Sequence, residues 1–236
     1  MTYKKVLIVG ISGCSSSGKT TLAKLTSEIL PGSTLIHEDD FFKHDDEVPF
    51  DEKYQIHNWD SPEALDLDLF GKELVHIKKT GTISAELIHN NNMGDLSELN
   101  VNQATLKEIS AKYSATFGDG DIKVVLVDGF MIYNNQDLAS RFDVKLLIRA
   151  PRATLKKRRA ARSGYKTLDS FWVDPPFYFD EFVYKAYAEN HACLFENGDV
   201  EGALKKDVDI YDFINDDNTD INEALMWICD HIISMR

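Results

Sequence analysis

The 236-residue chain predicts a three-layer α/β fold, an open parallel sheet with helices on both faces. Apolar, β-branched runs of strand length alternate with stretches that have helical spacing. Most of these runs are continuously apolar, which is typical of parallel strands buried on both faces. Ligands bind such sheets at the carboxyl ends of the strands. We therefore expect the chemistry directly after residues 11, 37, 128 and 149.

Two apolar runs and the pair Pro31-Gly32, which interrupts helices, predict the first three elements. Residues 4–11 are too few for a core helix and predict a strand. Residues 19–30 predict a helix, because leucine and isoleucine recur at helical spacing and Pro31-Gly32 ends the pattern. Residues 33–37 then predict the second strand.

The remaining elements are expected as follows. Ser61-Pro62 predicts a helix start, with Ser as the cap and Pro in the first turn. Residues 80–121 are interpreted as a peripheral excursion that contains a helix near 102–115. The last elements are, in chain order, a strand over 122–130, a strand over 143–150, a basic helix over 152–162, a helix over 177–195, a strand over 209–214 and a helix over 221–234. The run at 122–130 is the most apolar and predicts a central, buried strand.

Composition and charge limit the classes of function. Apolar residues make up 43% and charged residues 28%, as in an ordinary globular protein. With 39 acidic and 26 basic residues the net charge is −13, so nucleic acid and anionic membranes repel the chain. Cys14, Cys193 and Cys229 are too scattered for a disulfide framework or a zinc site. We expect a single domain over 1–236, in the cytoplasm or the nucleus, without a nucleic-acid, membrane or obligate protein partner.

One turn carries the strongest chemical signal. Residues 13–20 match G-x-x-x-x-G-K-[ST] between a predicted strand and a predicted helix. Such a turn points backbone N–H groups at phosphate oxygens, and the helix adds its positive end. The sequence thus predicts a nucleoside triphosphate, ATP with GTP as the alternative, with Mg²⁺ on the Thr20 hydroxyl. The expected nucleotide-binding residues are Gly13, Cys14, Ser15, Ser16, Ser17, Gly18, Lys19, Thr20 and the adjoining Thr21.

Carboxylates follow two of the predicted strands. Asp39 and Asp40 come after the second strand, where a carboxylate can accept the proton of an attacking hydroxyl and hold water on Mg²⁺. On composition alone, the acidic segment 38–47 would be a solvated charge run. Asp128 ends the most buried strand, where an ionised group needs a partner. Spacing does not decide which of Asp39 and Asp128 is the base and which organises the metal.

Residues 156–162 place five cations in seven positions of an otherwise acidic chain. Nuclear targeting or nucleic-acid contact is one explanation. A lid over about 156–176 explains the position better, because arginine can bind phosphate oxygens in pairs and stabilise charge during transfer. No N-K-x-D guanine motif occurs, and the small size favours a small-molecule kinase over a GTPase switch or a motor.

Together, these motifs resemble the nicotinamide riboside kinases, the fungal members above all. The resemblance covers nearly the whole chain except about 76–121. It is carried by ISGCSSSGKTT (11–21), IHEDDFFK (36–43), NWDSPEAL (58–65), VDGF (127–130), KRR (157–159) and DPPFYFD (174–180). It implies a nucleoside-kinase fold and transfer of the γ-phosphate of ATP to the 5′-hydroxyl of nicotinamide riboside, giving the mononucleotide for NAD synthesis.

The resemblance also implies roles for single residues. Asp39 would be the general base and share the Mg²⁺ site with Thr20, while Lys19 and Arg162 complete the catalytic group. Arg158 and Arg162 would contact the triphosphate, and the loop at 215–217, with Asp216, the adenine. The expected acceptor-binding residues are Asp39, Phe42, Trp59, Asp60, Asp128, Arg159, Tyr165 and Lys166, among which Asp60 would hold the ribose hydroxyls and Tyr165 face the pyridine ring.

The charge of the expected acceptor agrees with the aromatic residues. A pyridinium ring is a cation, and the faces of Trp59 and Tyr165 would hold it by cation–π attraction, worth about 2 kcal/mol when desolvated. Lys166 stands where the resemblance leads us to expect Gln, and it either points to solvent or favours the nicotinic acid riboside, whose carboxylate it can pair with. The alternatives are a uridine or cytidine kinase, and a nucleotide-gated binding protein without catalysis.

Overall fold

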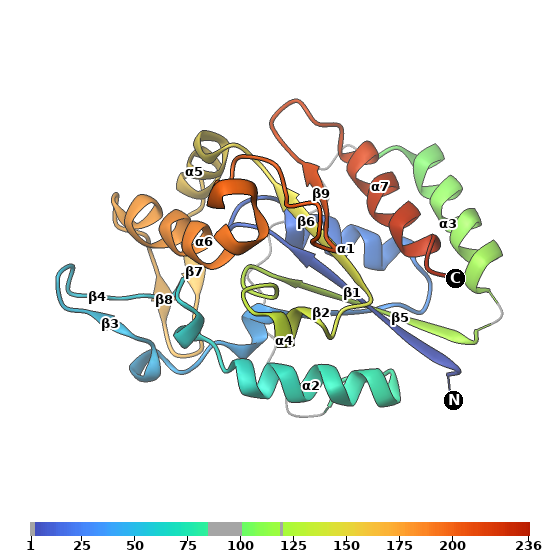
Figure 1. Ribbon diagram of the computed structural model, residues 1–236, viewed down its shortest axis with the longest axis horizontal. Helices are drawn as coiled ribbons and strands as arrows, with labels where there is room; N and C mark the ends of the chain where they lie inside the picture. Colours follow the sequence, from blue (N-terminus) through green and yellow to red (C-terminus); the bar gives the residue numbers. More distant parts are fainter. Residues whose placement is uncertain (1–2, 85–100, 119) are drawn as a thin grey trace.

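The computed structural model describes residues 3–84, 101–118 and 120–236, and it is built around one parallel sheet (Figure 1). The strand order of this five-stranded sheet is β2-β5-β1-β6-β9. Its strands are β1 (Lys5–Ser12), β2 (Thr34–His37), β5 (Ile122–Gly129), β6 (Val144–Arg149) and β9 (Tyr211–Ile214). All five predicted strands are confirmed, although β1 rather than β5 is the central one.

The register brings the predicted chemical residues to one edge of the sheet. β1 pairs with β5 so that Ser12 lies opposite Gly129, and β2 pairs with β5 so that His37 lies opposite Asp128. The turn after β1, the segment after β2 and the end of β5 are therefore neighbours, although about 90 residues of sequence separate the last two. The predicted chemical residues therefore follow the carboxyl ends of adjacent strands, where ligands bind in sheets of this kind.

Helices cover both faces of the sheet. On one face, α1 (Lys19–Ile29), α3 (Gln103–Phe117) and α7 (Ile221–Ile233) pack together, and on the other lie α2 (Leu67–Thr80) and the short α4 (Gln136–Ala139) (Figure 1). The side chains of β1 alternate between the two cores. Leu7, Val9 and Ile11 belong to the first core, and Val6 and Ile8 belong to the second.

Two expected helix positions are corrected. Ser61-Pro62 opens only the single 3-10 turn Pro62–Ala64, because Leu65 then pairs with Phe42 in extended conformation. The α-helix starts at Leu67, where the side chain of Asp66 accepts a hydrogen bond from the Leu69 N–H. The expected helix over 177–195 begins instead as the π-helical turn Phe179–Val183 and continues as α6 (Tyr184–His191).

The segment predicted to be peripheral is in part integrated with the core. α3 confirms the helix expected near 102–115, and it buries Ile109, Tyr113 and Phe117 in the same core cluster as α1 and α7. This part of 80–121 therefore belongs to a helical layer. Residues 85–100 and 119 lie outside the described residues.

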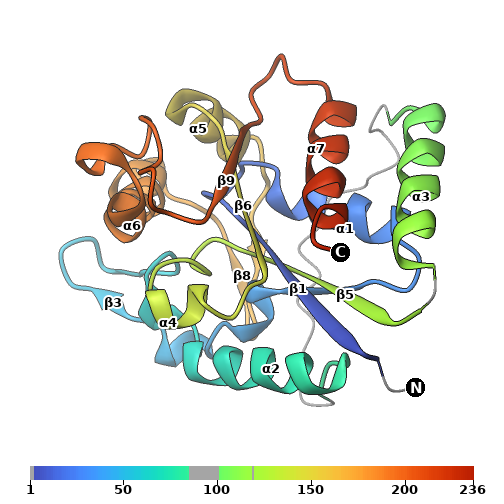
Figure 2. The ribbon, with the colours of Figure 1, turned by 45° about the vertical axis from the view of Figure 1, so that its right-hand side comes forward.

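Two small hairpins beside the sheet were not predicted. One joins β3 (Phe50–Asp51) to β4 (Ile56–His57), and the other joins β7 (Tyr165–Lys166) to β8 (Phe171–Trp172). Each strand has only two residues, too few to produce a readable alternation. With α5 (Arg152–Ala160) and α6 they form one end of the molecule (Figure 1), and α5, α6 and β3 lie on the same side in the second view (Figure 2). None of the described helices has both the length and the apolar character needed to cross a membrane.

Candidate active site

The turn between β1 and α1 has a backbone that only glycine allows at two points. Gly13 has φ +154°, and a Cβ there would lie 2.2 Å from the Ile148 carbonyl oxygen. Gly18 has φ +93°, and a Cβ there would lie 2.5 Å from the Asn215 side chain. Ser16 also has a positive φ, of 69°. The turn therefore curls back on itself directly before α1 starts at Lys19, as a phosphate-binding loop requires.

The side chains of this turn are suited to an anionic ligand. The hydroxyls of Ser16 and Ser17 are buried and have no hydrogen-bond partner among the described residues. Lys19 is only 8% exposed, so its ammonium group is held at the turn. Buried polar groups are normally satisfied, and phosphate oxygens would satisfy the Ser16 hydroxyl and the Lys19 ammonium group. Cys14 contributes only its backbone, because its side chain packs in an apolar cluster and burial raises the pKa of its thiol to about 12.

A cavity opens beside the turn. At its phosphate end the predicted lining residues are Ser15, Ser16, Lys19, Thr20 and Arg162. At the other end they are Asp39, Phe42, Trp59, Asp60, Arg159, Tyr165 and Lys166. Phe130, Thr167 and Trp172 also line the cavity and were not predicted, because an isolated aromatic or threonine beside a turn carries no sequence signal.

Asp39 and Asp128, which spacing could not tell apart, have different surroundings. Asp39 lines the cavity together with Lys19 and Thr20. Burial raises the pKa of Asp39, while the nearby Lys19 charge opposes that rise. Asp128 does not line the cavity. Its carboxylate accepts a hydrogen bond from the Thr20 hydroxyl at 2.5 Å and pairs with His37, so it lies behind Thr20.

Glu38, which the sequence did not single out, fixes the wall behind Asp39. Its carboxylate is fully buried, and Oε2 accepts hydrogen bonds from the backbone N–H groups of Phe130 at 2.7 Å and Met131 at 2.9 Å. Burial raises the pKa of Glu38 to about 8. The end of β2 is thereby tied to the turn after β5, which carries Phe130 into the cavity.

Arg159 links three parts of the site. Its guanidinium donates to Asp174 at 2.5 and 3.0 Å and to the Ser15 hydroxyl of the phosphate turn at 2.7 Å. It lies 3.6 Å from the Asp60 carboxylate and 4.6 Å from the centre of the Tyr165 ring. Because Arg159 is only 6% exposed, it connects the turn, the acceptor end of the cavity and the β7–β8 hairpin. The pairing of Arg159 with Asp174 was not predicted from the sequence.

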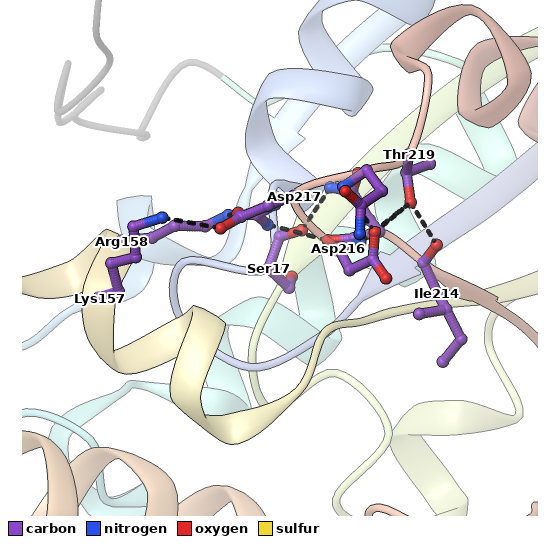
Figure 3. Close-up of polar contacts among 9 residues, drawn as sticks. Ser17, Lys157, Arg158, Ile214, Asp216, Asp217 and Thr219 are labelled. Atoms are coloured by element: carbon purple, nitrogen blue, oxygen red, sulfur yellow. Dashed lines mark hydrogen bonds and ion pairs between the residues drawn. The ribbon is translucent and has the colours of Figure 1, made fainter.

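Two nucleotide-binding predictions are not supported by the geometry. Arg158, expected on the triphosphate, donates instead to the Asn215 carbonyl at 2.9 Å and pairs with Asp217 at 3.1 Å (Figure 3). Lys157 reaches the same carboxylate at 2.9 Å. Asp216, expected near adenine, does not line the cavity, and its carboxylate accepts the Thr219 hydroxyl at 3.2 Å within its own loop. This loop binds the phosphate turn through the Asn215 amide, which donates to the Ser17 carbonyl at 2.7 Å.

Aromatic rings form the other walls of the cavity. Phe42 lies edge-on to Trp59 at 5.8 Å between ring centres and stacks on Phe130 at 5.9 Å. On the opposite side, Tyr165 carries the Arg162 guanidinium 5.4 Å from its ring centre. The Trp59 indole nitrogen and the Tyr165 hydroxyl are buried without a partner among the described residues. An aromatic acceptor that offers polar atoms would fit between these walls.

The sheet order, the glycine-bounded turn and the adjoining cavity define a P-loop phosphotransferase. No protein-family model matches the chain. The chain is 58% identical to a nicotinamide riboside kinase of Saccharomyces cerevisiae over 238 residues, covering 100% of this chain and 99% of that one. It is 53% identical to the nicotinamide riboside kinase of Eremothecium gossypii, covering 98% and 94%. The chain belongs to the nicotinamide riboside kinase family.

More distant similarities extend the comparison. Nicotinamide riboside kinase 1 of Homo sapiens is 30% identical over 187 residues, which cover 78% of this chain and 75% of that one. Among solved structures, a gluconokinase from Sinorhizobium meliloti has a TM-score of 0.46 at 11% identity, covering 99% of this chain and 94% of that chain.

Proposed function

We propose that this chain transfers the terminal phosphate of ATP to the 5′-hydroxyl of nicotinamide riboside, producing the mononucleotide used in NAD synthesis. The observation that carries the proposal is a single cavity, in a chain of this family, with a phosphate turn at one end and a carboxylate beside aromatic walls at the other. The nicotinic acid riboside, which differs by a carboxylate, is a second acceptor that Lys166 at the cavity wall favours.

The donor end is assigned to the P-loop. The unpartnered hydroxyl of Ser16 and the side chains of Lys19 and Arg162, which all line the cavity at this end, bind the phosphates. Arg158 is left out of this assignment because its guanidinium binds the Asn215 carbonyl and the Asp217 carboxylate in the loop after β9. The nucleoside of the donor is adenosine in this proposal, with guanosine as the alternative.

Magnesium fits the residues present beside the turn. The Thr20 hydroxyl and the Asp39 carboxylate are oxygen ligands, the kind that Mg²⁺ prefers, and both line the same cavity. When bound, Mg²⁺ neutralises charge on the phosphates. Asp128 keeps the Thr20 side chain in place through their 2.5 Å hydrogen bond.

Asp39 is the general base in this proposal, and Asp128 has a supporting role. Of these two carboxylates, Asp39 is the one that lines the cavity, where it can accept the proton of the 5′-hydroxyl as the oxygen attacks phosphorus. The pKa of Asp39 is raised by its burial, which makes the carboxylate a better proton acceptor. Asp60 holds the ribose hydroxyls in the same cavity, beside Arg159.

The acceptor is tested by a panel that measures ATP consumption with nicotinamide riboside, nicotinic acid riboside, uridine, cytidine, pantothenate and no acceptor. Consumption with either pyridine riboside, matched by mononucleotide formation, is the expected result. Consumption with uridine or cytidine alone would make the chain a pyrimidine nucleoside kinase. No consumption with any nucleoside would leave a nucleotide-gated binding protein.

The base is tested by Asp39→Asn, with Asp40→Asn as the matched control. Asp40 is the next residue, carries the same charge and does not line the cavity. We expect Asp39→Asn to lower kcat by about 10²- to 10⁴-fold while the KM for ATP stays near its wild-type value. Equal kcat values for the two variants would remove Asp39 from this role.

A further inference from the structure

A set of hydrogen bonds joins the tip of the β7–β8 hairpin to the segment after β2. Oδ2 of Asp45 accepts hydrogen bonds from the hydroxyls of Thr167 at 3.2 Å and Ser170 at 2.6 Å. In return, Asp169 accepts the backbone N–H of Asp45 at 3.0 Å and contacts the His44 ring nitrogen at 3.1 Å. We call these contacts the hairpin latch. It joins two parts of the chain separated by more than 120 residues.

Both sides of the latch lead directly into the acceptor end of the cavity. The hairpin contributes Tyr165, Lys166 and Thr167 to the cavity wall. The facing segment contributes Phe42, three residues before Asp45. That segment is itself anchored, because the Lys43 N–H donates to the Ala64 carbonyl at 3.0 Å. The latch therefore joins two walls of the cavity. One is the β7–β8 hairpin, which Arg159 contacts at Tyr165, and the other is the segment after β2, which carries Phe42.

The hairpin has little else to hold its tip. β7 and β8 pair over only two residues each, and isolated two-stranded hairpins are marginal in water. Phe171 on β8 is 58% exposed, and the apolar packing of this strand is confined to Trp172, whose ring contacts those of Trp59 and Tyr178. Within the turn, the Thr167 N–H donates to the Ser170 carbonyl at 3.0 Å. Within the described part of the chain, the hydrogen bonds that join Thr167, Asp169 and Ser170 to the segment after β2 are those of the latch.

Asp45 is an unusual residue for a purely structural contact. Its Oδ1 is buried and has no hydrogen-bond partner among the described residues. A carboxylate oxygen in that state lowers stability. The contact therefore contributes less to stability than its two hydrogen bonds alone would suggest. A charged acceptor does give stronger bonds to the two hydroxyls.

We propose that Asp45 is a positioning residue for the acceptor nucleoside. Through Thr167 and Ser170 it holds the β7 strand in place. Tyr165 and Lys166 of that strand are thereby kept at the acceptor end of the cavity. Without the latch, the acceptor must order the hairpin itself when it binds, so acceptor affinity falls while the phosphate turn is unchanged. This inference rests on the proposed function only for the identity of the acceptor.

The kinetic test is Asp45→Ala, with Asp46→Ala as the matched control. Asp46 has the same charge, is exposed and lines no part of the cavity. We expect Asp45→Ala to raise the KM for the acceptor about tenfold, since two hydrogen bonds to a carboxylate are lost, with the KM for ATP unchanged. Asp46→Ala should leave both constants unchanged. An equal rise in both KM values, or no rise in either, would overturn the proposal.

A double-mutant cycle adds the partner hydroxyl. Ser170→Ala removes the shorter of the two bonds to Asp45 and does not touch the cavity wall. The two substitutions should be non-additive, because each breaks the same contact. Independent, multiplicative effects on the acceptor KM would show that the two residues do not act through each other and would overturn the latch.

Hydrogen exchange separates the latch from the identity of the acceptor. In protein without any nucleoside, backbone amides in peptides covering 165–172 should exchange faster in Asp45→Ala than in the wild type or Asp46→Ala, while α7 stays unchanged. Equal hairpin exchange in all three proteins would overturn the latch even if nicotinamide riboside is the substrate. If the panel identifies another acceptor, the proposed function fails, and the KM comparison is made with that acceptor.

Discussion

Arg159 gives the sharpest prediction about the architecture of the site. Its side chain is 6% exposed and is paired with two carboxylates, of which Asp174 is 20% and Asp60 is 9% exposed. Arg159→Met removes the cation but leaves both carboxylates in place. Breaking a buried ion pair from one side destabilises a protein by about 3–5 kcal/mol, because the remaining charge is buried and unpaired. We expect a loss of this size in the free energy of unfolding.

The adjoining Arg158 is the matched control. It is also an arginine of α5 paired with an aspartate, but its partner Asp217 is exposed to solvent, which screens the interaction. Arg158→Met should leave the free energy of unfolding close to the wild-type value. Urea unfolding with linear extrapolation measures both variants. A similar loss in the two variants would refute the reasoning, as would failure of Asp174→Asn to restore part of the stability lost in Arg159→Met.

Further predictions concern a buried histidine, the thiols and the acceptor. Burial lowers the pKa of His191 from 6.5 to about 4, so the unfolded chain binds the proton first and stability falls as pH drops through this window. Between pH 7 and pH 5 His191 accounts for a loss of about 2 kcal/mol, which urea unfolding of His191→Gln should not show. In the folded chain, a thiol reagent should label the exposed Cys193 rapidly and spare Cys14 and Cys229, whose pKa values burial raises to about 12; rapid labelling of all three would contradict this. Lys166→Gln should lower kcat/KM for nicotinic acid riboside relative to nicotinamide riboside, and an unchanged ratio would rule out the pairing with the carboxylate.

The sheet and the phosphate turn were predictable because their signals are local. Continuous apolar runs identify β1, β5 and β6, and Gly13, Gly18 and Lys19 identify the turn whatever surrounds them. The helix start at Leu67 was not predictable in this way. Ser61-Pro62 is a good local start signal, but the pairing of Leu65 with Phe42 takes precedence, and this pairing depends on the fold.

The site was predictable as a set of residues but not as a set of contacts. Most of the expected lining residues lie in one cavity. Their neighbours follow from tertiary geometry: Arg158 and Arg159 are adjacent in sequence, but one turns to the loop after β9 and the other into the site. Likewise, composition alone made the acidic segment 38–47 resemble a solvated charge run, yet Glu38 binds two backbone N–H groups and Asp45 binds the hairpin.

The contact between Asn215 and Ser17 affects how the phosphate turn is made in the cell. The turn is encoded near the start of the chain, but the amide that supports it is supplied about 200 residues later, after the edge strand β9. A ribosome that has released only the first 200 residues has therefore produced β1, β5 and β6 with an unsupported loop. We therefore expect tight donor binding to begin only once the last strand has joined the sheet.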